Sequence, residues 1–251
     1  MRALFSTRSG GVSQSPFHSL NLGDHVGDAA QAVSANRAVF TQRLGGSIEP
    51  TDGVRPIFLN QVHGTHVVAL DADTPDGTVA DACLSVQRGL ACTIMVADCL
   101  PVLLTDQAGS FVAAAHAGWR GLAGQDGSGV LESVIAAIMA GSSRTTATLI
   151  AWLGPCIGPD AFEVGDEVRS VFVSHDARAA TCFTPITSGM PGKWLCDLQG
   201  LARQRLNSLG VAHVYGNDGS AAWCTVSNPS TFFSHRRDRV SGRMAASIWL
   251  A

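Results

Sequence analysis

The sequence lacks any uninterrupted apolar run of the roughly 20 residues that a membrane-spanning helix needs. Its longest apolar stretch, around Leu90 to Leu104, is broken by Asp98 and Pro101. The first residues soon become polar and show no apolar core of a secretory signal. We therefore expect a cytoplasmic protein with no membrane partner.

The chain also lacks a concentration of charge of one sign. Its net charge is −3 over 251 residues, and no basic stripe or block of like charges is visible. Binding of nucleic acid calls for such a stripe, so we expect no nucleic-acid partner. The glycine patterns of nucleotide-binding folds and the G-x-S-x-G motif of α/β-hydrolases are missing as well. These absences argue against the common nucleotide-binding folds and against serine-hydrolase chemistry.

Cysteine is present, but in an odd number and at irregular spacing, with seven residues in the chain. Without a secretory signal, this pattern indicates buried thiols, of which one or two are available as ligands or nucleophiles. At 46% apolar, the chain is able to bury a sizeable core. The length favours one domain, which we expect to span residues 1–251.

The hydrophobic periodicity predicts strands and helices that mix without a strict βαβ repeat. Helices are predicted over 29–44, 127–139, 164–173 and 198–209. Strands are predicted over 57–62, 65–70, 90–97, 111–115, 146–153, 211–215 and 244–250. Asp28 and Asp197 are the predicted caps of the first and last helices, which Gly45-Gly46 and Gly210 end. The expected fold class is α/β or α+β, a single compact domain with a mixed β-sheet flanked by helices.

Three short polar segments, each just past a predicted strand, contain the best metal-ligand candidates, His63, Cys99 and His116. Zinc accepts imidazole nitrogen and thiolate sulfur, and three protein ligands with an open fourth position are typical of catalytic zinc. The spacing is not that of a zinc finger, and a histidine or cysteine near a strand end is more often a structural residue. The residue types alone therefore leave both interpretations open.

Two further groups of side chains are candidates for chemistry. Arg8, Arg37 and the basic segment from Arg236 to Arg243 carry guanidinium groups that match phosphate and carboxylate geometry. Asp81 and Asp98 are candidates for proton transfer. Each of these residues also has a structural interpretation, as solvated surface, as a partner of Asp238 or as a holder of a neighbouring loop.

Taken in order along the whole chain, the short motifs resemble the YfiH/laccase-domain family, also called the multicopper polyphenol oxidase family. The motifs are Ser6-Thr7-Arg8, Asn21-Leu22-Gly23, Gln61-Val62-His63-Gly64, Ala80-Asp81-Ala82, Ala97-Asp98-Cys99-Leu100-Pro101, His116-Ala117-Gly118-Trp119-Arg120-Gly121, Leu153-Gly154-Pro155-Cys156 and Ser234-His235-Arg236-Arg237. The resemblance implies a YfiH-like α/β fold with one zinc ion bound by His63, Cys99 and His116. The sequence departs from the family pattern at Cys83-Leu84-Ser85, where a threonine-containing run is more usual.

The resemblance also implies purine nucleoside chemistry. The implied reactions are phosphorolysis of adenosine, inosine and methylthioadenosine to a free base and ribose 1-phosphate, and deamination of adenosine. Purine nucleosides and phosphate are then the expected small-molecule partners, for a monomer or weak homo-oligomer. Some bacterial members of the family are linked to peptidoglycan editing.

For this chemistry we expect Arg8, Arg37 and Arg236 to hold phosphate or ribose, and Gln61 to hydrogen-bond ribose or base. Zinc lowers the pKa of a bound water to about 7, which suits deamination. The usual deaminase motifs, H-x-E and P-C-x-x-C, are missing, so Asp81 or Asp98 is the expected proton carrier.

Three alternatives remain open at this point. Copper binds such ligands more tightly than zinc, which keeps copper-dependent phenol oxidation possible. However, the eight histidines include no H-x-H pair of the kind found in multicopper sites. Cys99 could instead be the nucleophile of a metal-free cysteine hydrolase, activated by His63 or His116. The third alternative is a non-enzymatic protein of cell-wall editing.

Overall fold

The largest element of the fold is a six-stranded mixed sheet. The structure is a computed structural model that describes residues 1–45, 53–140, 145–187 and 191–251. The sheet has the strand order β12 (His213–Gly216), β8 (Leu149–Leu153), β6 (Leu100–Asp106), β7 (Val112–Ala117), β4 (Ala82–Ser85) and β3 (Val67–Ala69). The pairs β12–β8 and β3–β4 are parallel, and the three central pairs are antiparallel.

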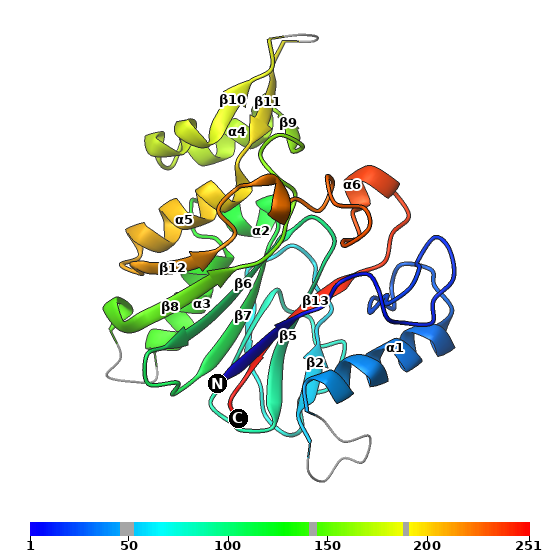
Figure 1. Cartoon of the computed structure of the whole chain (residues 1–251). Helices are drawn as coiled ribbons and strands as arrows, with labels where there is room; N and C mark the ends of the chain where they lie inside the picture. The colour runs from blue at the N-terminus through cyan, green and yellow to red at the C-terminus, as the bar shows by residue number, and fades with distance from the viewer. Residues whose placement is uncertain (46–52, 141–144, 188–190) are drawn as a thin grey trace.

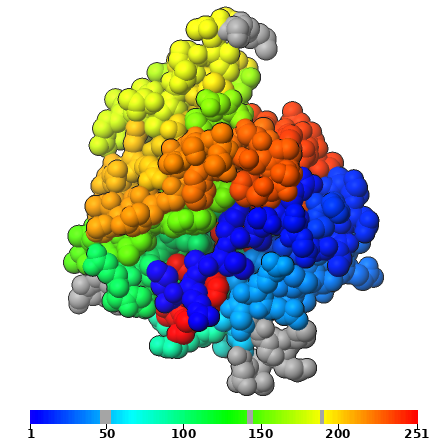
Figure 2. All heavy atoms as spheres, in the orientation of Figure 1, coloured from blue at the N-terminus to red at the C-terminus, as the bar shows by residue number. Residues whose placement is uncertain are grey.

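A second sheet contains both ends of the described chain. Its order is β1 (Arg2–Phe5), β13 (Met244–Trp249), β5 (Leu90–Val96) and β2 (Arg55–Phe58). All seven residues of β5 are buried, which explains the long apolar run of the sequence at this point. Because β1 pairs with β13, the two termini lie side by side (Figure 1), and the blue N-terminal residues border the red C-terminal ones in Figure 2.

The two sheets pack face to face, and helices cover their outer faces (Figure 1). Between the sheets, Ile94 and Met244 of one pack with Leu103 and Ala114 of the other. The alternate residues of the second sheet face helix α1 (Ala30–Arg43), whose Phe40 is fully buried. Helices α3 (Val130–Met139) and α5 (Leu198–Ser208) bury their apolar faces on the six-stranded sheet. Alternate residues of the second sheet therefore point into two different cores, one between the two sheets and one beneath α1.

The remaining elements are short. A small antiparallel sheet with the order β10 (Phe183–Pro185), β11 (Lys193–Cys196) and β9 (Glu163–Gly165) lies at the top of Figure 1, beside α4 (Asp166–Val173). The others are α2 (Trp119–Ala123), α6 (His235–Asp238) and the 3₁₀ helices η1 (Thr146–Thr148), η2 (Ala177–Cys182) and η3 (Ala221–Trp223). No helix among the described residues is long and apolar enough to cross a bilayer.

The expected α/β class, with a mixed sheet flanked by helices, is confirmed. Each predicted helix and strand has a counterpart, with ends displaced by a few residues. The division into three sheets was not predicted, and neither were β1, β4, β6, β10 and β11. Most of these strands are only three or four residues long, too short for alternation to identify.

Several local predictions need correction. Asp28 does not cap α1, because Ala29 is the N-cap and has no side-chain cap. The Asp28 carboxylate instead accepts hydrogen bonds from Ser13 and Asn21 and fixes the N-terminal loop. Residues 146–148 form a 3₁₀ turn rather than a strand, and residues 164 and 165 belong to strand β9 rather than to a helix.

Asp197 does cap α5 as predicted, since its carboxylate accepts from the Gly200 N–H at 2.7 Å. Gly210 has the expected positive φ of 84° after the helix end. At the end of α1, Gly45 has φ 85°, whereas Gly46 lies outside the described residues.

Candidate metal centre and pocket

The strand register brings three polar residues to one edge of the six-stranded sheet. Ala82 on β4 is opposite Ala115 on β7, so the next residues, Asp81 and His116, are neighbours, and the His116 N–H donates to the Asp81 carbonyl at 2.7 Å. Leu100 of β6 is opposite Ala117 of β7, which places Cys99 at the same edge. The sequence had placed His116 just after a strand, but it lies within β7.

His63 reaches this edge from the loop between β2 and β3. Its φ of 61° lies in the left-handed region, which is costly for a residue other than glycine. The Asp81 carboxylate accepts hydrogen bonds from the N–H groups of Val62, His63 and Gly64, at 3.1, 2.9 and 2.7 Å. These bonds hold the loop in its unusual conformation and so fix the position of His63.

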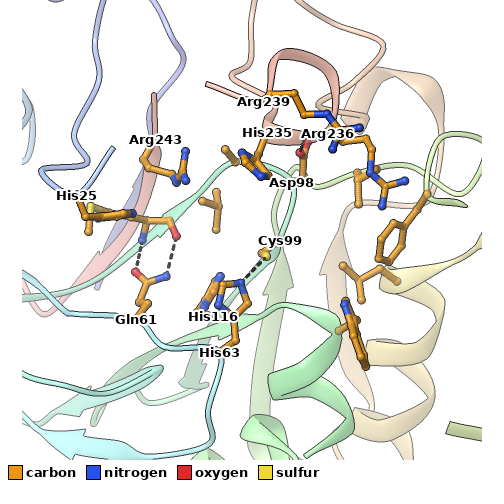
Figure 3. Close-up of a pocket in the computed structure, with 17 residues that line it drawn as sticks. His25, Gln61, His63, Asp98, Cys99, His116, His235, Arg236, Arg239 and Arg243 are labelled. Carbon is orange, nitrogen blue, oxygen red and sulfur yellow. Dashed lines mark hydrogen bonds between the residues drawn. The ribbon is translucent and has the colours of Figure 1, made fainter. Parts of the chain in front are cut away.

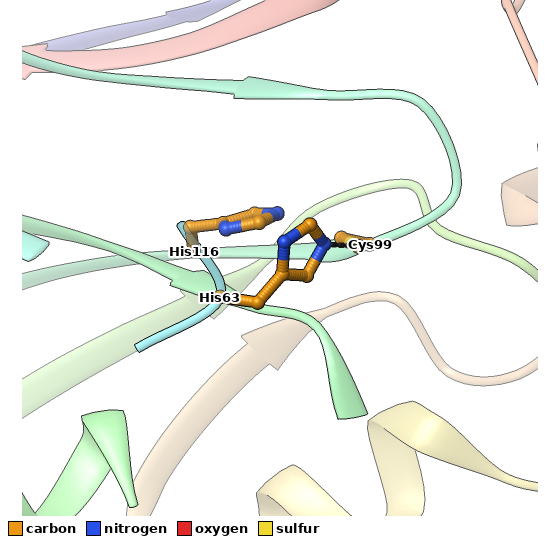
Figure 4. Close-up of side chains that lie close together, drawn as sticks. All are labelled: His63, Cys99 and His116. Carbon is orange, nitrogen blue, oxygen red and sulfur yellow. Dashed lines mark hydrogen bonds between the residues drawn. The ribbon is translucent and has the colours of Figure 1, made fainter. Parts of the chain in front are cut away.

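The side chains of His63, Cys99 and His116 converge (Figure 4), and their candidate ligand atoms lie within 4.8 Å of one another. Cys99 Sγ is 3.6 Å from His63 Nε2, and the two imidazole centroids are 4.7 Å apart. Gly118 makes this approach possible, because a Cβ there would lie 2.9 Å from both Cys99 Sγ and His63 Cδ2. Among the described residues, this is the one group of three or more such side chains close enough to share an ion.

The charges at this edge favour the metal-binding form of Cys99. Burial raises the pKa of the Cys99 thiol, but the adjoining His116 and His63 outweigh it and lower the pKa to about 6. Burial lowers the pKa of His116, but Cys99 and the Asp81 hydrogen bond outweigh it and raise the pKa to about 9. The two shifts together favour the thiolate form of Cys99. Thiolate is the form of cysteine that binds metals.

The donor set passes a simple test of fit to zinc. One thiolate and two imidazoles are ligands that zinc accepts, and three protein ligands are the number found in catalytic zinc sites. His116 Nδ1 lies 2.8 Å from Asp81 Oδ1, so Nε2 is the ring nitrogen that would bind an ion. A carboxylate that orients a histidine in this way is the usual support of a zinc-binding imidazole.

A pocket of about 320 Å³ adjoins the three side chains (Figure 3). Part of its lining is apolar and includes Trp119, Ile157, Phe162 and Leu198. Another part carries imidazole and guanidinium groups, those of His25, His235, Arg236, Arg239 and Arg243. A concave site of this size with a few convergent polar groups is typical of small-molecule binding.

Two of the residues predicted to bind substrate line this pocket. The Arg236 guanidinium donates to the Glu163 carbonyl at 3.0 Å and stacks over the Phe162 ring. The Gln61 amide forms two hydrogen bonds of 2.8 Å with the backbone of Met95, one in each direction. Gln61 therefore already holds the end of β5 in place beside the pocket.

The other two predicted arginines do not line the pocket. Arg8 donates to the carbonyls of His18 and Pro229 and stacks over Phe233. Arg37 pairs with Asp24 at 3.2 Å and stacks over Phe58. Both guanidinium groups thus hold the N-terminal loop against the rest of the fold.

The two predicted proton carriers also lie in different places. Asp98 lines the pocket, with φ 91°, and its oxygens accept from the Thr225 hydroxyl at 2.5 Å and the Arg236 N–H at 2.6 Å. Asp81 is fully buried beside His116 and is not part of the lining. Burial raises the pKa of Asp81, but its hydrogen bonds with His116 and the loop outweigh this effect and lower the pKa overall.

Several lining residues were not singled out from the sequence. Arg239 and Arg243 belonged to the basic segment, but nothing there distinguished them from Arg237, which pairs with Asp238. Their positions depend on the path of the loop between α6 and β13. Trp119 and His235 stand in motifs of the family resemblance without a role assigned to them, and His25 and Phe162 were not given a role either.

The chain matches the family model described as multi-copper polyphenol oxidoreductase laccase over residues 2–251. A Pseudomonas aeruginosa protein named purine nucleoside phosphorylase is 48% identical, and the match covers 100% of this chain and 93% of the relative. Purine nucleoside phosphorylase YfiH of Escherichia coli is 46% identical, with 99% and 93% covered.

Solved structures show the same similarity. A crystal structure of a Neisseria meningitidis protein matches with a TM-score of 0.85 and 47% identity, over 99% of this chain and 93% of the other. The Bacillus licheniformis YfiH structure matches with a TM-score of 0.85 and 29% identity, over 99% and 92% of the two chains.

Proposed function

Because this chain belongs to the multi-copper polyphenol oxidoreductase laccase family, and its curated relatives are named purine nucleoside phosphorylases, we propose that it is such a phosphorylase. In this reaction a phosphate oxygen bonds to C1′ of the nucleoside as the bond from C1′ to the purine breaks. The purine leaves with the electron pair and takes up a proton, and ribose 1-phosphate is formed. The observation that carries the proposal is a pocket with both apolar and cationic walls beside the His63–Cys99–His116 cluster.

The proposed metal is zinc, bound by His63, Cys99 and His116. When bound, zinc would supply a Lewis acid that polarises an oxygen of water or substrate. Asp81 orients the His116 ring and fixes the His63 loop through the contacts described above. Gly118 leaves room for Cys99 and His63 to approach each other.

The purine base and the ribose of the substrate match the apolar and the cationic parts of the pocket lining, respectively. A purine ring is flat and apolar on its faces, so Trp119 and Phe162 are the proposed contacts of the base. Arg236, which stacks over Phe162, is the proposed contact of the ribose. Gln61 is proposed to act through Met95, and Arg8 and Arg37 through the loop that they hold.

Adenosine, inosine and methylthioadenosine are the proposed nucleosides, and deamination of adenosine is a proposed second activity of the same pocket. Of the two candidate proton carriers, Asp98 is the better placed, because it lines the pocket whereas Asp81 is fully buried. The cytoplasmic location and the monomeric or weakly oligomeric state stay predictions. The seven free cysteines fit a reducing compartment.

Each of the alternatives has an observation of its own. The family's description favours copper chemistry, yet the described residues hold one three-ligand cluster rather than several. The lowered pKa of Cys99 beside two histidines is also what a cysteine hydrolase requires. A cell-wall editing role would be independent of turnover, and ligand variants that keep the cellular role would favour it.

The first experiment measures the metal content of tag-free protein together with phosphate-dependent release of adenine from adenosine. Cys99→Ala is compared with Cys182→Ala, a buried cysteine away from the cluster. We expect about one zinc per chain, with zinc and turnover lost in Cys99→Ala and kept in Cys182→Ala. Copper with phenol oxidation, or metal-free protein that acts on acyl substrates, would contradict the proposal.

A further inference from the structure

Arg243 is fixed in the pocket wall by contacts with described residues that use only one edge of its guanidinium group. Its Nη1 donates to the carbonyls of Ser241 and Gly242, at 2.8 and 3.2 Å. Its backbone N–H donates to the Asn21 side chain at 2.8 Å. Gly23 makes room for the stem, because a Cβ there would lie 2.7 Å from Arg243 Cγ. The remaining edge, formed by Nε and Nη2, is the one suited to two parallel hydrogen bonds.

Within the part of the chain that the structure describes, no carboxylate forms an ion pair with Arg243. Asp98 is close enough to interact with it, but both of its oxygens already accept hydrogen bonds from Thr225 and Arg236. Burial lowers the pKa of Arg243, an effect that Cys99 and Asp98 only partly oppose. A partly buried guanidinium in this position is most stable when an anion binds to it.

The other two arginines of the pocket are less suited to this role. Arg236 has one amino group committed to the Glu163 carbonyl and stacks over Phe162, at the apolar part of the wall. Arg239 is exposed. In Figure 3, Arg243 and His25 lie together on the side of Cys99 away from Arg236.

His25 adds a hydrogen-bonding group at the same place. The His25 side chain is about half exposed, with Nδ1 3.5 Å from Asp24 Oδ1. Partial burial and the positive charge of Arg243 lower the pKa of His25 and outweigh the opposing effect of Asp24. The lowered pKa favours the neutral ring, which adds a polar contact without another positive charge.

We propose that Arg243 binds the phosphate co-substrate through Nε and Nη2, with His25 beside it, while the purine lies against Phe162 and Trp119. This assignment rests on the proposed phosphorylase function. It orients the substrates, because phosphate and base then approach the ribose from two sides. It gives to Arg243 the phosphate contact for which the sequence had offered Arg8, Arg37 and Arg236, as ligands of phosphate or ribose.

The test separates the two substrates by their kinetics. Arg243→Gln and Arg243→Lys are compared with wild type and with Arg178→Gln, a control in which an exposed arginine remote from the pocket is changed. In Arg243→Gln we expect the KM for phosphate to rise about tenfold to hundredfold, the effect of losing a charge-assisted hydrogen-bond pair. The KM for adenosine should change far less. Arg243→Lys keeps the charge but lacks the two parallel N–H donors of the guanidinium group, and we expect an intermediate KM for phosphate.

A direct titration of each protein with inorganic phosphate distinguishes failure of this inference from failure of the proposed function. If wild type releases adenine with phosphate and both Arg243 variants keep its KM for phosphate, the assignment is wrong. If wild type shows no phosphorolysis, the proposed function fails. The phosphate titration then tests the anion site at Arg243 by itself. Phosphate binding that is weakened in both variants would still support the anion site, and equal or absent binding would reject it. Should Arg243→Gln not fold, Arg243→Lys carries the comparison.

Discussion

At the scale of single residues, the geometry of the His63–Cys99–His116 cluster depends on neighbouring residues that are not themselves ligands. Gly118 shows this, because its backbone has an ordinary φ of −66° that alanine also adopts. An added methyl group would therefore cause no backbone strain. It would only push against Cys99 Sγ and His63 Cδ2, both 2.9 Å from the new Cβ.

We predict that Gly118→Ala weakens zinc binding by about tenfold or more, as changes around metal ligands commonly do. Competition with a chelator would measure the affinity. Gly109→Ala is the control, because its φ of 63° disfavours alanine while nothing lies within 4 Å of the new Cβ. That variant should lose about 1 kcal/mol of stability and keep its zinc affinity. Equal zinc affinity in both variants would show that the absence of a side chain at Gly118 is not required for Cys99 and His63 to approach each other.

We predict that Asp81→Asn also weakens zinc binding, by about tenfold to a hundredfold. An amide offers one acceptor oxygen in place of two. Either the N–H groups of Val62 and Gly64, or the His63 N–H and the His116 ring, then lose their acceptor. Zinc affinity and adenosine deamination are measured on the same sample. Full deaminase activity would reject Asp81 as the proton carrier, whereas normal zinc affinity with deamination lost would restore it.

At the scale of elements, helix α5 carries part of the pocket wall through Leu198, so its N-terminus matters for the site. Asp197 caps this helix by accepting the Gly200 N–H. Burial raises the pKa of the Asp197 carboxyl, partly opposed by that hydrogen bond and by Arg203. Its folded pKa is therefore above its unfolded value. The buried charge costs stability once the pH has risen through the folded pKa, and this cost vanishes below the unfolded pKa, about 3.9.

From this we predict that Asp197→Ala lowers the free energy of unfolding by about 1 kcal/mol. Asp197→Asn keeps an acceptor for the cap without the charge, so at pH 7 it should be at least as stable as wild type. The difference between the Asn variant and wild type should shrink as the pH falls below about 4. The measurement is urea unfolding of the three proteins at pH 7 and at a pH below about 4. An Asn variant as unstable as the Ala variant would show that the charge itself contributes to the cap.

At the scale of the whole molecule, the proposed ion joins segments that are far apart in the chain. The loop after β2, the start of β6 and the end of β7 meet at His63, Cys99 and His116. An ion bound to the native state alone stabilises it by about 4 kcal/mol at a free concentration a thousandfold above Kd.

We therefore predict that a chelator lowers the Tm of wild type, by roughly 2–4 °C for each kcal/mol of binding free energy lost. It should leave the Tm of Cys99→Ala almost unchanged, since that variant lacks a ligand. Differential scanning calorimetry with and without chelator tests this. An equal decrease in both proteins would place the stabilising metal elsewhere.

The sequence alone determined the α/β class, the approximate positions of most helices and strands, and the three residues that the fold then brought together. Apolar periodicity, Asp197 and Gly210 act over a few neighbouring residues, so they can be recognised along the chain. The proposed ligands were recognisable because their short motifs resemble those of a known family.

Only the tertiary structure decided which polar groups face the pocket. Arg8, Arg37 and Arg243 are alike in sequence, yet only Arg243 lines the pocket. The sequence offered Asp81 and Asp98 equally as proton carriers, and only the pairing of β4 with β7 places Asp81, fully buried, against His116. The physical reason is that convergence depends on strand register and loop packing between distant residues, and local patterns carry no information about either.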